Sequence, residues 1–266
     1  MKTKGFASFV ASGLLLLLTC LAAEAQPHGL KKGSCDTFEI SSADKNPRYQ
    51  CVKAAAPITV DGRLDEPAWS RPEVFRDFRL TNGETVPTYP TEFRACWDSK
   101  YLYLAFVSTD PKIVAKHTKR DATVYEDDCV EAFLSSDGYP KRYFEFEFNP
   151  RNTQMDASVV FAKTGREKTV DYGWNCAGLK SATRVEGTGA TQKWTLEIAL
   201  PFSQIGRKRK TPAVGEEWRA NFYRIEYATQ PAEFICWSPT ILPSFHTPER
   251  FGKLLFVEKR AAKRGR

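Results

Sequence analysis

One stretch of alternating residues constrains the fold of this chain more than any other. Residues 125–149 contain two runs in which apolar and polar side chains alternate, on either side of a Ser-Ser-Asp-Gly-Tyr-Pro turn. This pattern predicts a β-hairpin with one face in a core and the other facing outward. The predicted inner face carries the apolar side chains Val130, Ala132, Leu134, Phe144, Phe146 and Phe148.

The predicted outward face of this hairpin is acidic. Glu131 lies on the first strand, and Glu145, Glu147 and Asn149 lie on the second. Folding the hairpin about Gly138 places Glu131 roughly opposite Glu145, with about 5 Å between their Cβ atoms. Because like charges at this distance repel each other, we expect a cation, a hydroxyl-rich ligand or a shared proton to offset them.

The first residues are typical of a secretory signal peptide. Two lysines precede an apolar run over residues 6–21, and Ala23-Glu24-Ala25 forms a small-x-small cleavage site. We therefore predict a signal peptide over residues 1–25 and a polar leader over residues 26–56. A membrane anchor and a lipid attachment at Cys20 are the alternatives. We expect export to the periplasm, the extracellular space or the cell surface, with no membrane contact after cleavage.

The net charge of +7 does not indicate a nucleic-acid partner. Much of the excess lies in the signal segment and in residues 259–266, which we predict to be a solvated, disordered basic tail. The remainder of the chain is nearly neutral.

Six cysteines remain after the predicted cleavage. In an exported protein, Cys35 and Cys51 are the first pair to consider for a disulfide. Cys96, Cys129 and Cys236 lie in strand-like runs, where buried thiols are expected. No cysteine and histidine cluster with zinc-ligand spacing is present.

The rest of the chain predicts an all-β fold. A helical turn is expected at Leu64–Trp69, with Asp65 as its cap, and a long loop at Gly165–Gly178 carries Tyr172 and Trp174. We predict an antiparallel β-sandwich over residues 57–258 with few short helical turns. Besides the hairpin, the expected strands are residues 58–60, 91–97, 101–109, 153–162, 179–187, 193–200, 218–227, 234–237 and 253–257.

Five motifs follow one another along the chain: Val60 to Trp69, Trp97 to Tyr103, Glu126 to Phe133, Trp194 to Pro201, and Pro248 to Gly252. Their order resembles that of the family-nine carbohydrate-binding modules. The resemblance covers roughly Pro57 to Val257 and implies a jelly-roll-like sandwich related to the DOMON group, of a kind often joined to secreted glycosidases. It also implies a site that grips the terminal sugar of a chain between two aromatic rings, and structural calcium, as in the founding members.

The resemblance also implies a set of site residues. The two rings of the clamp fall on Tyr125 and Phe245, and the side chains that bond sugar hydroxyls match Glu131, Glu147 and Asn149. The chain departs from the family pattern at the clamp, where tryptophans are usual, and at Glu147, where a basic residue is usual.

Further residues complete the predicted site. Glu145 neighbours the matched carboxylates, and Trp174 is a candidate replacement ring. No cofactor is required. Asp127 and Asp128 are candidate calcium ligands, with capping of the hairpin end as the alternative role.

The predicted function is that of a stand-alone, secreted, non-catalytic module that binds an oligo- or polysaccharide in support of polysaccharide breakdown. One alternative is a haem-binding protein of the DOMON type, in which Met155 is the candidate axial ligand. The others are a glycoside hydrolase accessory with weak activity and a surface protein without a sugar site.

Overall fold

The computed structural model describes residues 46–138, 141–162 and 167–259. The chain divides into Met1–Glu39, which lies outside the described residues, and Ile40–Arg266, which contains every element given below. The predicted signal peptide, Cys35 and most of the basic tail also lie outside the described residues.

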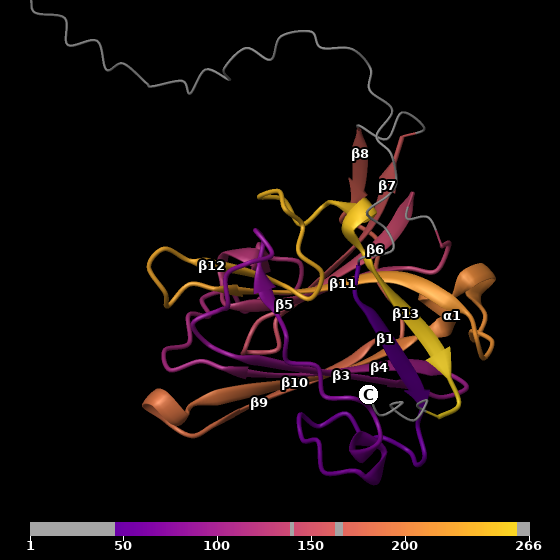
Figure 1. Cartoon of the computed structure of the whole chain (residues 1–266), viewed down its shortest axis with the longest axis horizontal. Helices are drawn as coiled ribbons and strands as arrows, with labels where there is room; N and C mark the ends of the chain where they lie inside the picture. The colour runs from indigo at the N-terminus through magenta and orange to yellow at the C-terminus, as the bar shows by residue number, and fades with distance from the viewer. Residues whose placement is uncertain (1–45, 139–140, 163–166, 260–266) are drawn as a thin grey trace, which may run out of the picture. The chain divides into compact units, whose positions relative to one another are not determined.

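The described part of the chain is built almost entirely from strands (Figure 1). The elements are β1 (Arg48–Lys53), η2 (Pro67–Ser70), β2 (Arg79–Leu80), β3 (Thr91–Trp97), β4 (Tyr101–Thr109), η3 (Val124–Glu126), β5 (Cys129–Ser135), β6 (Arg142–Phe148), β7 (Gln154–Phe161), β8 (Lys168–Asp171), β9 (Lys180–Glu186), η4 (Gly189–Thr191), β10 (Lys193–Pro201), α1 (Phe202–Ile205), η5 (Arg207–Arg209), β11 (Glu217–Glu226), β12 (Glu233–Cys236), η6 (Pro248–Arg250) and β13 (Gly252–Val257).

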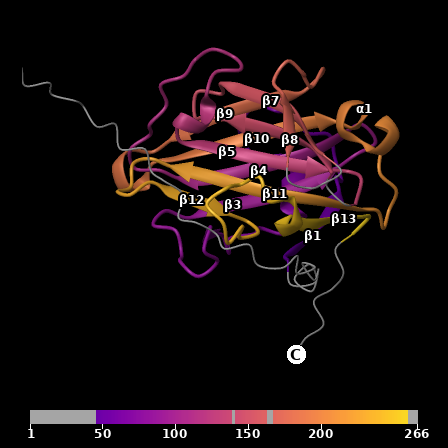
Figure 2. The ribbon, with the colours of Figure 1, turned by 90° about the horizontal axis from the view of Figure 1, so that it is seen from above.

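The strands form one curled sheet whose two halves face each other. Its hydrogen-bonded order is β8-β7-β6-β5-β11-β13-β1-β3-β4-β10-β9, with β12 joining β11 to β2. In Figure 1 the layer of β3, β4, β10 and β9 lies below β11, and Figure 2 shows from above how the two layers overlap. The predicted β-sandwich with few helical turns is confirmed.

The main core fills the space between the two layers. Alternate residues of each strand point into it, as a period of two requires. From one layer come Val130, Phe146 and Trp218, and from the other come Leu104 and Leu196, all with no solvent exposure. The predicted inner face of the hairpin lies here, except that Phe144 is only partly buried.

The outer faces of both layers are covered as well. A second cluster lies on β5, β6, β7 and β11, and includes Phe133, Tyr143 and Phe245. A third lies on β1, β3, β4 and β10, and includes the buried Trp69. The hairpin face that was predicted to point outward is therefore buried, because loops pack over it.

Strand β1 corrects the predicted leader. Residues of Arg48–Lys53, which the sequence pattern assigned to the polar leader, pair in parallel with both β13 and β3. These two ladders are an exception to the otherwise antiparallel sheet. Cys51 is buried on β1, whereas Cys35 lies outside the described residues, so their pairing stays a prediction.

Two other local predictions were wrong. Residues 58–60 form no strand, and β8 forms inside the stretch that was predicted to be a loop. β8 forms because it pairs with β7, the strand before it in the chain, whereas residues 58–60 pair with no described strand and pack against the third apolar cluster.

The predicted helical turn exists as η2, and it delivers Trp69 to a buried position, where 4% of its surface is exposed. Glu66, not Asp65, is its N-cap residue, and neither this side chain nor any other makes a capping hydrogen bond there. The turn is instead held by Glu197 on β10, which accepts hydrogen bonds from Trp69 Nε1 at 3.0 Å and from the backbone N–H of Asp61 at 2.9 Å.

Gly252 explains why the motif at Pro248–Gly252 ends in glycine. A Cβ atom at this position would lie 2.5 Å from Cζ3 of Trp237 and 2.7 Å from the carbonyl oxygen of Pro47. Any larger residue would therefore push β13 away from its neighbours.

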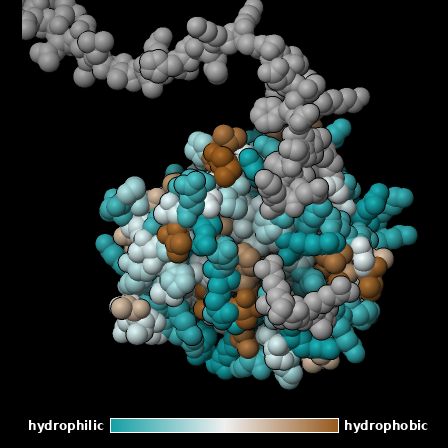
Figure 3. Space-filling view, viewed as in Figure 1, coloured by the Kyte–Doolittle hydropathy of each residue, from teal (hydrophilic) through white to brown (hydrophobic). Residues whose placement is uncertain are grey.

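The surface is mostly hydrophilic on the face that Figure 3 shows, with small hydrophobic patches. No helix among the described residues combines the length and the apolar character needed to cross a membrane.

Candidate functional site

Three glutamates meet on the covered face of the hairpin. Glu131 comes from β5, and Glu145 and Glu147 come from β6. One carboxylate oxygen from each lies within 4.8 Å of the others, and the three residues are 3%, 5% and 2% exposed. The acidic cluster that the sequence predicted therefore exists, but as a buried group.

The register of the hairpin differs from the prediction. Glu131 lies opposite Glu147, and Phe133 lies opposite Glu145. The prediction had paired Glu131 with Glu145, so the partner on β6 lies two residues later than expected. Because a strand has a period of two, the shift leaves the same side chains on the same face.

Burial raises the pKa of all three carboxyl groups. The pKa of Glu145 rises to about 7, although the positive charge of Lys168 opposes the effect. The charge of Glu145 adds to the increase for Glu131, and the charges of both neighbours add to it for Glu147. Loss of water is thus the main cause for all three carboxyl groups, and repulsion by neighbouring carboxylates adds to it for Glu131 and Glu147.

Two exposed tyrosines border this cluster. Tyr125 lies in η3 and is 45% exposed, and its backbone N–H lowers the pKa of Glu147. Tyr172 follows β8 and is 61% exposed, and the charges of Glu145 and Glu147 contribute to its raised pKa after the effect of burial. Tyr172 was not among the predicted site residues. The signal available in the sequence was its position in the predicted loop, two residues before Trp174.

Phe245 does not present a free ring at this cluster. It is 9% exposed and stacks on Tyr223, with 4.1 Å between the ring centroids and 10° between the planes. The edge of Phe234 lies against it at 6.0 Å. The second ring of the predicted clamp is therefore part of the second apolar cluster.

The neighbouring His246 extends this packed region. Its Nδ1 atom lies 2.5 Å from the hydroxyl of Tyr143. Burial lowers the pKa of His246 to about 4, so the ring is neutral, and its Nδ1 atom shares a hydrogen bond with the tyrosine hydroxyl.

Trp174 lies on the other face of the hairpin. Its ring stacks on Phe144 with 4.6 Å between centroids, against the main core. It borders a cavity of about 370 Å³ that Arg142 and Asp171 also line. The structure does not bring this residue to the three glutamates.

Both polar atoms of the Asn149 side chain form hydrogen bonds within the protein. Its Nδ2 donates to the carbonyl oxygen of His117 at 2.9 Å and to Asp127 at 2.8 Å, and its Oδ1 accepts from the N–H groups of Arg151 and Thr153. A sugar hydroxyl would have to displace one of these bonds.

Asp127 and Asp128 point to different places. Asp127 accepts hydrogen bonds from the backbone of Lys116 and His117 and from Asn149, which is the capping role considered as the alternative. Asp128 accepts hydrogen bonds from the N–H of Tyr227 at 2.7 Å and from the N–H of Val114. Both carboxylates are therefore already used as acceptors for backbone N–H groups.

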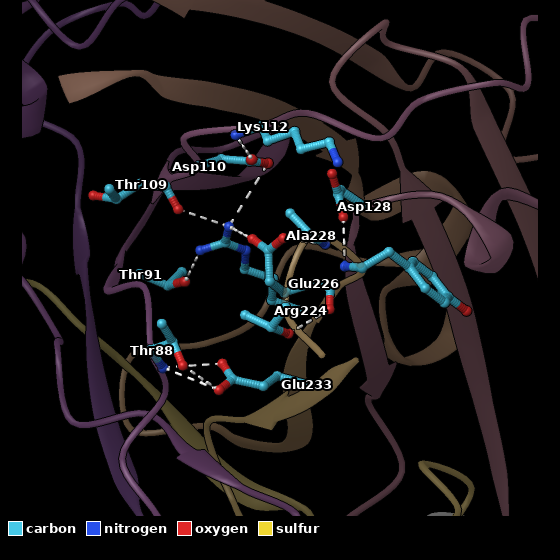
Figure 4. Close-up of polar contacts among 12 residues, drawn as sticks. Thr88, Thr91, Thr109, Asp110, Lys112, Asp128, Arg224, Glu226, Ala228 and Glu233 are labelled. Atoms are coloured by element: carbon cyan, nitrogen blue, oxygen red, sulfur yellow. Dashed lines mark hydrogen bonds and ion pairs between the residues drawn. The ribbon is translucent and has the colours of Figure 1, made fainter. Parts of the chain in front are cut away.

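Asp128 belongs to a second acidic group, in which an arginine side chain supplies a positive charge. Asp110, Asp128 and Glu226 lie within 4.8 Å of one another, and the buried Arg224 reaches into them (Figure 4). Its Nη2 atom pairs with Glu226 and lies 3.8 Å from Asp110. The guanidinium also donates to Thr91 and to the carbonyl oxygen of Thr109, as Figure 4 shows.

A larger cavity, of about 1080 Å³, lies on the outer face of the other layer. Several of its charged side chains pair with one another: Glu92 binds Arg76 at 2.8 Å and Arg94 at 3.0 Å, and Arg184 binds Glu186. It does not include the three glutamates.

Met155 packs inside the second apolar cluster with 4% of its surface exposed. It lines neither of the two cavities described above, and the haem alternative is not favoured.

Comparison with known sequences agrees with this fold. The sequence model of carbohydrate-binding family 9 matches residues 72–256. A relative called "Extracellular protein" from Arthroderma benhamiae is 28% identical over 68% of this chain and 85% of its own length. Endo-1,4-beta-xylanase C of Paenibacillus barcinonensis is 23% identical over 76% of this chain, but the match spans only 16% of that enzyme.

Solved structures share the fold. A putative carbohydrate-binding protein from Bacteroides uniformis is similar with a TM-score of 0.64 and 20% identity, over 79% of this chain and 99% of that one. A family 9 module from Caldicellulosiruptor kristjanssonii, solved in complex with cellotriose, has a TM-score of 0.56 and 16% identity, over 83% of this chain and 98% of that one.

Proposed function

Because the chain belongs to carbohydrate-binding family 9, a family of non-catalytic binding modules, we propose that it binds a glucan chain at the surface above Glu131, Glu145 and Glu147. The cellotriose bound by the related solved module supports an oligosaccharide of glucose as the ligand to test first. We further propose that the protein is exported and acts in support of polysaccharide breakdown, in line with the names of two of its relatives.

The observation that carries this proposal is the pairing of exposed aromatic rings with buried acceptors. Tyr125 and Tyr172 are exposed rings beside carboxylates, and Glu145 Oε2 and Glu147 Oε2 have no hydrogen-bond partner among the described residues. A pyranose has an apolar face and a rim of hydroxyl donors, so it can satisfy both kinds of group at once.

The predicted two-ring clamp changes in one respect. Tyr125 keeps its proposed role, and Tyr172 replaces Phe245 as the second ring, because Phe245 is already stacked on Tyr223. The same proposal covers the position of the bound sugar unit in its chain. Because the rings of Tyr125 and Tyr172 are both exposed, the site fits a terminal unit or an internal one.

Titration calorimetry with cellotriose tests the proposal. We expect a dissociation constant in the micromolar to millimolar range, since few contacts must offset the cost of association. Tyr125→Ala and Tyr172→Ala should each weaken binding about 2- to 10-fold, because one ring contact contributes about 0.5–1.5 kcal/mol.

Tyr101→Ala is the matched control. This tyrosine packs on the outer face of the opposite layer, in the third apolar cluster, so its loss should leave the affinity unchanged. Absence of binding to cellotriose and to a wider set of soluble oligosaccharides would refute the proposed function. An equal loss in all three variants would refute the proposed location.

A further inference from the structure

The smaller cavity, of about 370 Å³, is a site that the proposed glucan surface does not use. Part of its lining is a row of paired residues across three strands, formed by Phe144 on β6, Ser158 on β7 and Asp171 on β8. Another part is the turn that follows α1, from Gly206 to Arg209. Segments that are distant in the sequence therefore build this cavity together.

The lining carries an excess of positive charge. Its cationic side chains are Arg142, Arg207, Lys208 and Arg209. None of the four forms an ion pair within 4.0 Å or a side-chain hydrogen bond with a residue that the structure describes. The lining also contains the carboxylates of Asp137 and Asp171. Four cations against two carboxylates leave a net charge of +2.

The backbone holds the basic turn in a compact conformation. The N–H of Gly206 donates to the carbonyl oxygen of Phe202 at 2.8 Å, and the N–H of Arg209 donates to that of Gly206 at 2.7 Å. A Cβ atom at Gly206 would lie 2.6 Å from the carbonyl oxygen of Phe202 and closer still to that of Lys210, so the turn requires glycine here. Because the turn is already ordered, a ligand does not have to order its backbone on binding.

Neutral polar side chains of the lining also lack partners. Ser158 is 7% exposed, and its hydroxyl forms no hydrogen bond with the described part of the chain. The side chains of Ser136 and Gln204 form none within residues 46–138, 141–162 and 167–259 either. Since buried hydroxyl groups usually have a partner, Ser158 indicates a water or a ligand in the cavity.

An aromatic ring completes the lining. Trp174 stacks on Phe144 with 4.6 Å between the ring centroids, and the edge contact with Phe146 lies at 6.0 Å. These contacts fix the ring, which remains partly exposed, and its Nε1 donates to no residue in the described ranges. A fixed, partly exposed ring of this kind can pack against the apolar face of a pyranose.

Together these groups select an acidic sugar. Arginine and lysine bind a carboxylate through charge-assisted hydrogen bonds, and arginine can form two of them in parallel. The free hydroxyl of Ser158 and the amide of Gln204 match the hydroxyl groups of the sugar, and the indole of Trp174 matches its apolar face. A nucleic acid would need a basic stripe along several phosphates, whereas the chain without its signal segment and tail is nearly neutral.

We propose that this cavity binds a uronic acid unit of an acidic polysaccharide, with its carboxylate on Arg142 and the basic turn and its ring on Trp174. The site lies on the other face of the hairpin from the three glutamates, so it is separate from the proposed glucan surface and does not depend on it. When both sites are occupied, one protein holds a neutral chain and an acidic chain together.

Titration calorimetry of the full-length protein with tetragalacturonate, a chain of four uronic acid units, tests this site. We expect a dissociation constant in the micromolar to millimolar range that rises with salt concentration, because salt screens exposed charges. The double variant Arg207→Gln, Arg209→Gln should bind about 10-fold more weakly, since it removes two exposed charge contacts. Trp174→Ala should weaken binding about 2- to 10-fold, and its melting temperature shows whether it still folds.

The double variant Arg184→Gln, Lys193→Gln is the matched control, because it removes the same charge from the lining of the larger cavity. It should bind tetragalacturonate as wild type does. An equal loss in the two double variants would show that net charge alone attracts the ligand and would overturn the site. Absence of binding to tetragalacturonate in wild type would overturn it as well.

Two further ligands test the ligand class. The methyl ester of tetragalacturonate keeps the sugar rings but has no charge, so it should bind about 10-fold more weakly. Equal binding of the ester would overturn the role of the carboxylate. A single-stranded DNA oligonucleotide of four phosphates should bind more weakly than tetragalacturonate, and tighter binding of the DNA would overturn the choice of an acidic sugar.

Titrations with both ligands separate this inference from the proposed function. The variant Arg207→Gln, Arg209→Gln should bind cellotriose with the affinity of wild type, and Tyr125→Ala should bind tetragalacturonate with the affinity of wild type. Loss of both ligands in either variant would overturn the separation of the two sites. Binding of tetragalacturonate without any binding of cellotriose would support this inference and overturn the proposed function.

Discussion

At the scale of single residues, the buried charges distinguish this protein. Glu197 has its oxygens fully used by backbone and indole N–H groups, and Arg224 is surrounded by carboxylates and carbonyl oxygens with no solvent contact. Removing one partner from such a group is costly, because the charge left behind cannot return to water.

We therefore expect Arg224→Met to destabilise the fold strongly. Asp110 and Glu226 would lose their counter-charge, at a cost of about 3–5 kcal/mol in the free energy of unfolding. Urea denaturation monitored by tryptophan fluorescence measures the change. Arg76→Met is the control, since Arg76 pairs with Glu92 at the surface and its loss should cost less than about 1 kcal/mol. Similar losses in the two variants would contradict the central role of Arg224.

At the scale of elements, β1 connects parts of the sheet that would otherwise be edges. It pairs with β13 on one side and β3 on the other, and the hydroxyl of Tyr49 bonds to the carbonyl oxygen of Glu73 at 2.6 Å. It also buries Tyr49, Cys51 and Val52. Each such side chain contributes about 1.5–3 kcal/mol, so the sum is comparable with the stability of a typical domain.

A shortened chain that begins at Pro57 should consequently fail to fold. We expect it to lack a cooperative thermal transition in circular dichroism, because β13 and β3 would expose unpaired backbone groups. A chain that begins at Asn46 keeps β1 and should melt within a few degrees of the full-length protein. Cooperative melting of the shorter chain would show that β1 is dispensable.

At the scale of the whole molecule, several buried carboxyl groups share one direction of pKa shift. Burial raises the pKa of Glu197 and Glu226 to about 7 and that of Asp128 to about 6. A carboxyl group whose pKa is higher in the folded state than in the unfolded state binds a proton on folding. Its contribution to stability is complete below the unfolded value and is lost as the pH rises through the folded value.

The free energy of unfolding should therefore fall as the pH rises from about 5 to 8. His246, whose pKa is lowered to about 4, has the opposite effect, because its contribution to the free energy of unfolding falls as the pH drops below about 6.5. A comparison of wild type with a variant at one carboxyl group removes this effect, since both proteins contain His246. Relative to Glu197→Gln, which cannot titrate, wild type should lose on the order of 1 kcal/mol between pH 5 and 8. Urea denaturation at both pH values, in chelator, measures the difference. Parallel stability curves for the two proteins would contradict the assignment.

Local patterns were enough to specify most of the strands and their faces. Alternation over residues 125–149 predicted a hairpin with an apolar and an acidic face. The strands at 91–97 and 101–109 coincide with the predicted runs, which a turn at residues 98–100 separates. A strand with a period of two allows this, since each side chain's face follows from its position alone.

Long-range packing settled the rest, because it depends on segments that are distant in the sequence. No local signal shows that residues 48–53 pair with a strand two hundred positions later, that loops bury the acidic face of the hairpin, or that Phe245 finds Tyr223 and loses its free ring. The three glutamates were visible in the sequence as neighbours on one face of a predicted hairpin. Their burial follows only once the covering residues are in place.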